Sequence, residues 1–336
     1  MMTNSKISKD QRRARAALWG IAIGDAFGKM TEGYWPPDVK SHYGGPVEEF
    51  VDPIPTNPDR AGVWTYAEVT DDTRLTVLVA ESIIAKGGVD EAEIVSKIVA
   101  APVKGWPGWE ELRQKAPRAE WMNRTGNGAP IRVCPIGIIN GATQIEQLTQ
   151  DVYACCRCSH GSKSALAAAN AIAAAFAGVF EEMDKPTVLE VALQAAILGD
   201  RLGTEDYLPS VPRRIEWLRN VYLKTKSKWK QGLNPGFPAW EGAIFALYLF
   251  LKHDSAKEAI VEAANSGGDA DSIASMSGGL LAARHPESLP QVWQKTVQER
   301  NDLDLDTLAD ALVRLRGNRA SNNRMHTDAL SRAGDA

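Results

Sequence analysis

Two clusters of carboxylate and hydroxyl side chains, far apart in the sequence, contain the residue types that bind divalent cations. They consist of Thr70, Asp71 and Asp72 in the first and of Asp269, Asp271 and Ser272 in the second. Each cluster opens an apolar run that predicts a helix, and Gly267 and Gly268 precede the second. The free N–H groups and the macrodipole of a helix N-terminus favour acidic side chains there. Carboxylate and hydroxyl oxygens are hard ligands, which suit Mg²⁺, Mn²⁺ or Ca²⁺ rather than zinc.

The repetition of this chemistry predicts that the two clusters face each other across one site. Together they would supply four carboxylates and hold two divalent cations a few ångströms apart. Such a pair of cations activates water and holds a substrate oxygen. Taken alone, either cluster is equally well explained as a helix N-terminus with spare acidic caps.

Three other residues have a weaker claim to a functional role. Asp25 lies between Gly24 and Ala26 in the opening helix and is predicted to be a buried acid that ties backbone groups together. Glu32 follows where that helix should end, and a lone glutamate there is normally solvated. His160 precedes an alanine-rich helix, where it would cap, ligate or contact substrate, and a structural role is the favoured interpretation.

A Gly-x-Gly turn, Gly126-Asn127-Gly128, could bring backbone N–H groups close to a phosphate, with Arg132 as a fixed cation nearby. A lone turn of this kind is as often a simple tight turn. Its assignment to a phosphate therefore needs a separate reason.

The composition is that of an ordinary globular protein, with 336 residues, 44% hydrophobic and 24% charged. A formal charge of −4 gives no electrostatic case for binding nucleic acid or an anionic membrane. The chain is long for one domain, but no linker divides it. We expect a single domain over residues 1–316 and a disordered polar tail over residues 317–336.

Neither export nor membrane insertion is expected. The apolar segment after Arg15 resembles a signal peptide only until Asp25 interrupts it. The alanine-rich run 164–180 contains Asn170 and predicts a closely packed core helix rather than a membrane span. The four cysteines lack the spacing of a zinc site and predict buried, reduced thiols, which favours a cytoplasmic protein. The cysteines are Cys134, Cys155, Cys156 and Cys158. We also expect a monomer.

Strand signals are nearly absent, so the fold should be all-α. Helices are predicted to about Met30, over 73–86 and over 136–147, with a last one from an Asp306 cap to Leu315. Two stretches rich in proline and glycine, 34–64 and 102–130, are predicted to be long ordered loops. Loops of this length are more often functional lids than linkers.

The two acidic clusters, taken together with three other stretches, make the chain resemble the ADP-ribosylglycohydrolase family. Five stretches carry the likeness in the family's order: Gly20 to Glu32, Thr70 to Thr73, Gly126 to Arg132 with Pro135, Ser159-His160, and Gly268 to Ala274. The resemblance implies a compact orthogonal helical bundle with two Mg²⁺ or Mn²⁺ ions. It implies, as ligands, Thr70, Asp71, Asp72, Asp269, Asp271 and Ser272.

The resemblance also assigns roles to the weaker candidates. Glu32 falls where the family has a mobile acid over the metals, and residues 126–128 fall where it cradles the diphosphate of ADP-ribose. His160 lies in a further family segment and is carried over as a substrate contact. The tryptophans between 105 and 121 match no family motif and would shape the choice of acceptor.

The implied reaction is hydrolysis of the bond between ADP-ribose and its acceptor, a protein or a small conjugate. Glu32 or Asp72 would act as the general base. One alternative is a catalytically silent protein that binds ADP-ribose or a nucleotide. Another is an all-α prenyl-diphosphate enzyme, but its motif wants a further acid beyond Asp72, where the chain has Thr73, Arg74 and Leu75.

Overall fold

Helices account for the regular structure of the chain, as predicted. The computed structural model describes residues 7–56, 63–100, 104, 124–225 and 232–334. Within those residues there is no β-strand, and the β pairing consists of two isolated bridges, Gly126 with Pro238 and Ser162 with Thr204. The fold class is therefore all-α.

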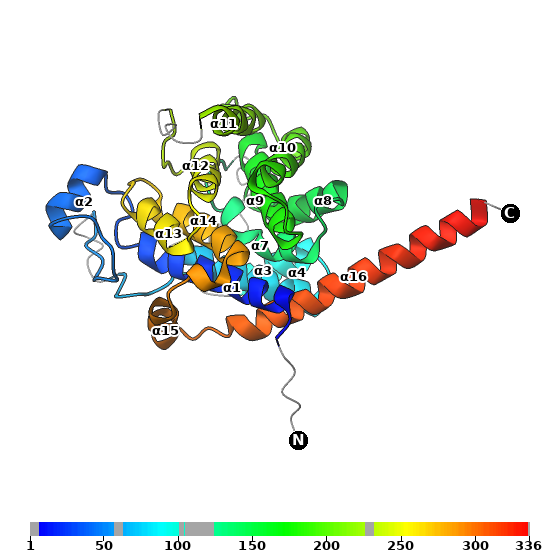
Figure 1. Cartoon of the computed structure of the whole chain (residues 1–336), viewed down its shortest axis with the longest axis horizontal. Coiled ribbons are helices and arrows are strands. Elements are labelled where there is room, and N and C mark those ends of the chain that lie inside the picture. The colour runs from blue at the N-terminus through cyan, green and yellow to red at the C-terminus, as the bar shows by residue number, and fades with distance from the viewer. Residues whose placement is uncertain (1–6, 57–62, 101–103, 105–123, 226–231, 335–336) are drawn as a thin grey trace, which may run out of the picture.

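The described helices follow one another along nearly the whole chain (Figure 1). In chain order they are α1 (Lys9–Gly28), α2 (Pro36–Tyr43), α3 (Asp71–Lys86), α4 (Glu91–Ala100), η2 (Pro130–Arg132), α7 (Cys134–Ile139), α8 (Ile145–Cys156), α9 (Lys163–Phe180), α10 (Lys185–Leu202), α11 (Val211–Thr225), α12 (Ala239–Lys252), α13 (Ala256–Ala264), α14 (Ala270–Arg284), η3 (Pro286–Ser288), α15 (Gln291–Arg300) and α16 (Leu305–Gly334).

The closest packing in the fold is between α1 and α14, two helices from opposite ends of the sequence. Gly20, Gly24 and Gly28 form one stripe of α1, because residues four apart share a helix face. A Cβ added at Gly20 would lie 2.6 Å from the carbonyl oxygen of Gly278. At Gly24 and Gly28 the carbonyls of α14 would lie closer still. The two backbones therefore touch, and glycine is required at each contact.

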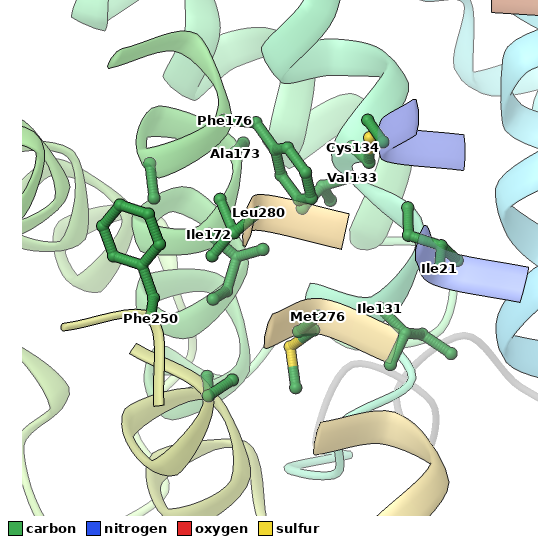
Figure 2. Packing of buried hydrophobic residues seen from close by; sticks show 14 of the residues in the cluster. Ile21, Ile131, Val133, Cys134, Ile172, Ala173, Phe176, Phe250, Met276 and Leu280 are labelled. Atoms are coloured by element: carbon green, nitrogen blue, oxygen red, sulfur yellow. The ribbon is translucent and has the colours of Figure 1, made fainter. Parts of the chain in front are cut away.

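The hydrophobic core surrounds this pair and is centred on α9. That helix is alanine-rich and buried along nearly its whole length, as the sequence predicts. It is long and apolar enough to cross a membrane by length and composition, but 94% of that stretch is buried inside the protein. Figure 2 shows Phe176 of α9 beside Val133, the N-cap residue of α7, in a cluster that also includes Ile21 of α1 and Leu280 of α14. Small side chains on the central helices let the larger ones fill the space between them.

Two predicted segments differ in the structure, and the structure does not test a third. The loop predicted over 34–64 contains the helix α2, which begins at the proline pair after its Trp35 cap, a favoured position for proline. The helix predicted over 136–147 is two helices, because α7 ends at Ile139 and α8 begins at Ile145. The tryptophan-rich segment lies outside the described residues.

The last helix is the largest departure from the sequence prediction. Asp304, not Asp306, accepts from the N–H of Thr307 and caps α16, and Asp306 instead binds Arg15. The helix then continues past Leu315 to Gly334, so residues 317–334 are helical rather than without regular structure. No proline interrupts the segment, and a single glycine weakens a helix without ending it. Its C-terminal part extends away from the other helices (Figure 1).

We predict that Gly24→Ala destabilises the protein by at least about 2 kcal/mol, because the added methyl collides with the backbone of α14. Alanine is otherwise the better helix former by about 1 kcal/mol. Gly317→Ala is the matched control, since Gly317 is also helical and a Cβ there meets nothing within 4 Å. Urea denaturation measures both variants. Equal stabilities would contradict close packing of α1 against α14.

Candidate active site

The two acidic clusters lie at helix N-termini, as predicted. Thr70 is the N-cap of α3, and its side chain accepts a hydrogen bond from the N–H of Asp72. Asp269 is the N-cap residue of α14, so Asp271 falls in its first turn. At both places the positive end of the helix dipole reduces the cost of holding an acid.

A two-glycine turn sets the position of Asp269. Gly267 and Gly268 have φ angles of 87° and 68°, in the left-handed region that other residues adopt at a cost. A Cβ on either would also collide with a backbone carbonyl, that of Tyr34 or that of Pro235. The N–H of Asp269 donates to the same Pro235 carbonyl, at 2.9 Å. The glycines therefore allow three chain segments to meet where the second cluster begins.

The two clusters converge around Asp271. One group of carboxylates comprises Asp25, Asp72 and Asp271, and a second comprises Glu32, Asp269 and Asp271. Within each group the potential ligand oxygens lie within 4.8 Å of one another. The facing arrangement predicted from the sequence is thus present in the fold.

Asp25 holds the first cluster in place. Its carboxylate accepts from the N–H and hydroxyl of Thr70, at 2.9 and 2.7 Å, and from the N–H and hydroxyl of Thr73, at 3.1 and 2.5 Å. The residue is fully buried. This is the buried acid that the sequence predicts, and it fixes the N-terminus of α3 against α1.

The clusters open onto a cavity of about 640 Å³. Its lining includes most of the predicted site residues: Glu32, Asp71, Asp72, Gly126, Asn127, Gly128, His160, Asp269, Asp271 and Ser272. Thr70 is not part of this lining and instead lines a second, larger cavity, but its hydroxyl lies 3.3 Å from Asp72 Oδ2. That larger cavity, of about 770 Å³, lies between α3 and the start of α16, and neither carboxylate group opens onto it.

Arg132 does not reach the cavity, so the structure does not place it as the predicted cation near a phosphate. It is fully buried, and its Nη2 donates to Ser159 Oγ at 2.7 Å and to the carbonyls of Cys155 and Cys156. The sequence shows that residue 132 is positively charged but not where its side chain points. In the structure the side chain points toward the end of α8. The arginine that lines the cavity is instead Arg124.

Arg132 acts on the cavity through His160. Because Arg132 donates to Ser159 Oγ, the Ser159 hydroxyl proton is available to His160 Nδ1, which lies 3.0 Å away. This arrangement favours the tautomer in which the imidazole proton is on Nε2. Burial, and next the charges of Arg132 and Arg124, lower the pKa of His160 well below its usual value. His160 therefore offers the cavity a neutral N–H donor.

Asn127 links the predicted substrate loop to the second cluster. Its Nδ2 donates to Asp269 Oδ2 at 2.6 Å and to the carbonyl of Gly236 at 3.1 Å. The N–H of Asn127 donates to the carbonyl of Phe237, so this amide is already used. The loop backbone lies directly against His160, since a Cβ at Gly128 would come within 2.7 Å of the ring.

The sequence interpretation missed Lys29, Trp64 and Phe237, which also line the cavity. Lys29 is the C-cap of α1, and its ammonium forms ion pairs with Glu32 and with Asp271 Oδ2, the latter at 3.2 Å. Its spacing offered a signal, because Lys29 stands four residues after Asp25 and three before Glu32.

Crowding raises the pKa values of the carboxyl groups. Burial is the main cause for Asp25, whose pKa rises to about 6, and for Asp71, whose pKa rises to about 7; the charge of Asp271 adds to both. Burial and neighbouring carboxylates also raise the pKa values of Asp72 and Asp269 well above the usual range. Burial acts to lower the pKa of Lys29, but the charges of Asp271 and Glu32 outweigh it and raise that pKa.

The acidic residues fit a hard divalent cation. Asp72 is buried, and its Oδ1 has no hydrogen-bond partner among the described residues. A buried carboxylate oxygen without a donor is costly unless a cation satisfies it. Thr70, Asp71 and Ser272 lie close enough in sequence to the carboxylate groups to complete an oxygen-rich set.

We predict that chelated protein becomes more stable as the pH falls from 8 to 6.5. Asp25 and Asp71 have folded-state pKa values above the usual 3.8, so the folded chain retains protons that the unfolded chain has lost. His160 opposes this trend below about pH 6.5, because its folded-state pKa is lowered.

Thermal unfolding of the wild type and of Asp71→Asn isolates the carboxylate contribution. His160 is unchanged in the variant, so its effect cancels in the comparison. The variant should show a shallower dependence on pH between 6.5 and 8. A wild-type slope no steeper than that of the variant would contradict the raised pKa of Asp71.

Comparison with known proteins agrees with this geometry. The chain is 24% identical to mouse ADP-ribosylhydrolase ARH3 over 90% of this chain and 91% of that protein. It is 22% identical to the ADP-ribosyl-[dinitrogen reductase] glycohydrolase of Rhodospirillum rubrum over 91% and 97%. A solved structure described as an ADP-ribosylglycohydrolase-related protein complex shares the fold, with a TM-score of 0.67 and 22% identity over 92% of this chain and 99% of that one. The ADP-ribosylglycohydrolase family model matches residues 7–322, and the chain belongs to that family.

Proposed function

We propose that the protein hydrolyses the bond between the anomeric ribose carbon of ADP-ribose and an acceptor group, and that it needs Mg²⁺ or Mn²⁺ to do so. The observation that carries the proposal is the meeting of two acidic helix N-termini around Asp271, on the wall of one cavity. Family membership supports the substrate class. A cavity of about 640 Å³ is in the usual range for a small-molecule site.

Asp72 and Asp271 are the central ligands of the proposed cation, with Thr70, Asp71, Asp269 and Ser272 around them. A bound cation would fix the ribose hydroxyls and make a nearby water more acidic. Asp25 keeps the first cluster rigid, since its carboxylate is saturated by hydrogen bonds from Thr70 and Thr73. Asp25 would therefore have a supporting role away from the cavity, whereas the acids that face the cavity would bind the cation.

The diphosphate would lie beside residues 126–128. Three features support this placement: the backbone N–H groups of Gly126 and Gly128, the neutral Nε2–H of His160, and the charge of Arg124. Arg124 takes the role that the sequence assigned to Arg132. We also propose a reducing, cytoplasmic setting, which four buried free cysteines support.

In the proposed reaction, water adds to the anomeric carbon, the bond from that carbon to the acceptor breaks, and the acceptor leaves with a proton. Glu32 is the base we favour, because its carboxylate is 28% exposed at the cavity edge, whereas Asp72 is buried within the ligand group. Positive charge that develops on the ribose ring would be stabilised by the surrounding carboxylates.

A panel of ADP-ribosyl conjugates tests the activity and identifies the acceptor. Arginine-linked, serine-linked, nucleic-acid-end and O-acetyl conjugates are incubated with the protein in Mg²⁺, in Mn²⁺ and in chelator, and free ADP-ribose is measured by chromatography. We expect release from at least one conjugate with metal and none with chelator. Binding of ADP-ribose without release from any conjugate would identify a silent binder and overturn the proposal.

Asp271→Asn should lower turnover of the cleaved conjugate by about 10²–10³-fold or more, because Asp271 belongs to both carboxylate groups. Its far-UV circular dichroism should be unchanged. Asp52→Asn removes the same charge from an exposed residue and should retain full activity. Wild-type turnover by Asp271→Asn would show that the reaction occurs elsewhere.

Glu32→Gln tests the base separately from the ligands. We expect a loss of about 10²–10⁴-fold in kcat with little change in KM, since general-base catalysis contributes to the transition state. Metal binding should persist, because Asp72 and Asp271 are intact. A large change in KM with normal kcat would instead assign Glu32 to substrate binding.

A further inference from the structure

Lys29 occupies an unusual place for a lysine. As the C-cap of α1 it lies at the end of the helix that packs most closely on α14, and its side chain is only 10% exposed. Two of its three ammonium donors are used on Glu32 and on Asp271 Oδ2. The ring centroid of Trp64 lies 5.0 Å from the same nitrogen, which adds a cation–π contact.

The two carboxylates that hold Lys29 belong to the second carboxylate group. With Asp269 they form the set whose ligand oxygens lie within 4.8 Å of one another. An ammonium bonded to two of these three acids stands where a divalent cation bound to the same acids would stand. The first group, of Asp25, Asp72 and Asp271, has no lysine or arginine bonded to Asp25 or Asp72 among the described contacts.

The fold anchors this ammonium. Gly28, directly before Lys29, contacts the backbone of Ala270, directly before Asp271. Lys29 and its acidic partner Asp271 therefore project from two backbones that touch, which keeps their side chains close together. A divalent cation bound to the same acids would also lie close to the positively charged ammonium, which would repel it.

We propose that the Lys29 ammonium replaces the second of the two divalent cations, so that each chain binds one Mg²⁺ or Mn²⁺, held by Asp72 and Asp271 of the first carboxylate group. This rests on the proposed function, and it revises the two ions that the family resemblance implies. The replacement would change the chemistry of the site as well as the number of bound ions. An ammonium donates hydrogen bonds to substrate oxygens, but it has no open coordination position for a water. Water activation then falls to the single ion and to Glu32.

The count of bound Mn²⁺ tests the proposal. Full-length chain is stripped with chelator, titrated with Mn²⁺ and analysed by isothermal titration calorimetry, with bound metal confirmed by elemental analysis. We expect one Mn²⁺ per wild-type chain and two in Lys29→Met, which keeps the length of the side chain and removes its charge. Lys29→Arg, which keeps the charge, should still bind one.

Lys104→Met is the matched control. Lys104 lies 4.4 Å from the same Trp64 ring but pairs with Glu68, outside both carboxylate groups. The Lys104→Met variant should bind one Mn²⁺ per chain, like the wild type. Lys29→Gln provides a second neutral variant in case Lys29→Met does not fold, as judged by circular dichroism.

Two Mn²⁺ in the wild type would overturn the inference and leave the proposed function intact. One Mn²⁺ in both the wild type and the neutral Lys29 variants would also overturn it, because the ammonium would not be what excludes the second ion. No bound Mn²⁺ in any variant, together with no metal-dependent release of ADP-ribose, would overturn the proposed function itself. The conjugate panel and the metal count therefore separate the two failures.

Discussion

Contact between the backbones of α1 and α14 is the constraint on which the site depends. The pairs Gly20 with Gly278, Gly24 with Ala274 and Gly28 with Ala270 advance along one helix as they retreat along the other, so the helices are antiparallel. The C-terminal end of α1 therefore meets the N-terminal end of α14. That meeting places Asp25 and Lys29 beside Asp271. Close packing brings these side chains together without any long loop to position them.

Concentrating this many acids is electrostatically unfavourable, and the fold offsets the cost in several ways. Helix N-termini hold Asp71, Asp72 and Asp271, where the dipole favours negative charge. Asp25 is satisfied by two threonines, and Lys29 neutralises part of the remaining charge. What is left, above all the unpaired oxygen of Asp72, is the part that a bound cation would satisfy. The site thus retains an unfavourable energy that binding can relieve.

Residues outside the cavity set the chemistry of those inside it. Arg132 is buried at the end of α8, yet it donates to Ser159, whose hydroxyl lies 3.0 Å from Nδ1 of His160 on the cavity wall. Asn127 joins the Gly126–Gly128 turn to Asp269, so this hydrogen bond couples the turn to the second acidic cluster. Such supporting contacts orient functional side chains more finely than the backbone alone.

The sequence by itself determined the all-α class, the two acidic helix N-termini and the role of Asp25, because helical periodicity, capping residues and paired glycines act over a few neighbouring positions. It could not give the direction of Arg132, the cap and length of α16, or the cation offered by Arg124. The spacing of Lys29 from Asp25 and Glu32 was a signal, but the sequence could not show its contact with Asp271, which is 242 residues away. These features depend on which distant segments pack together. Local patterns specify helices and their ends, whereas only tertiary packing decides which charges become neighbours, and charge interactions depend on distance and burial.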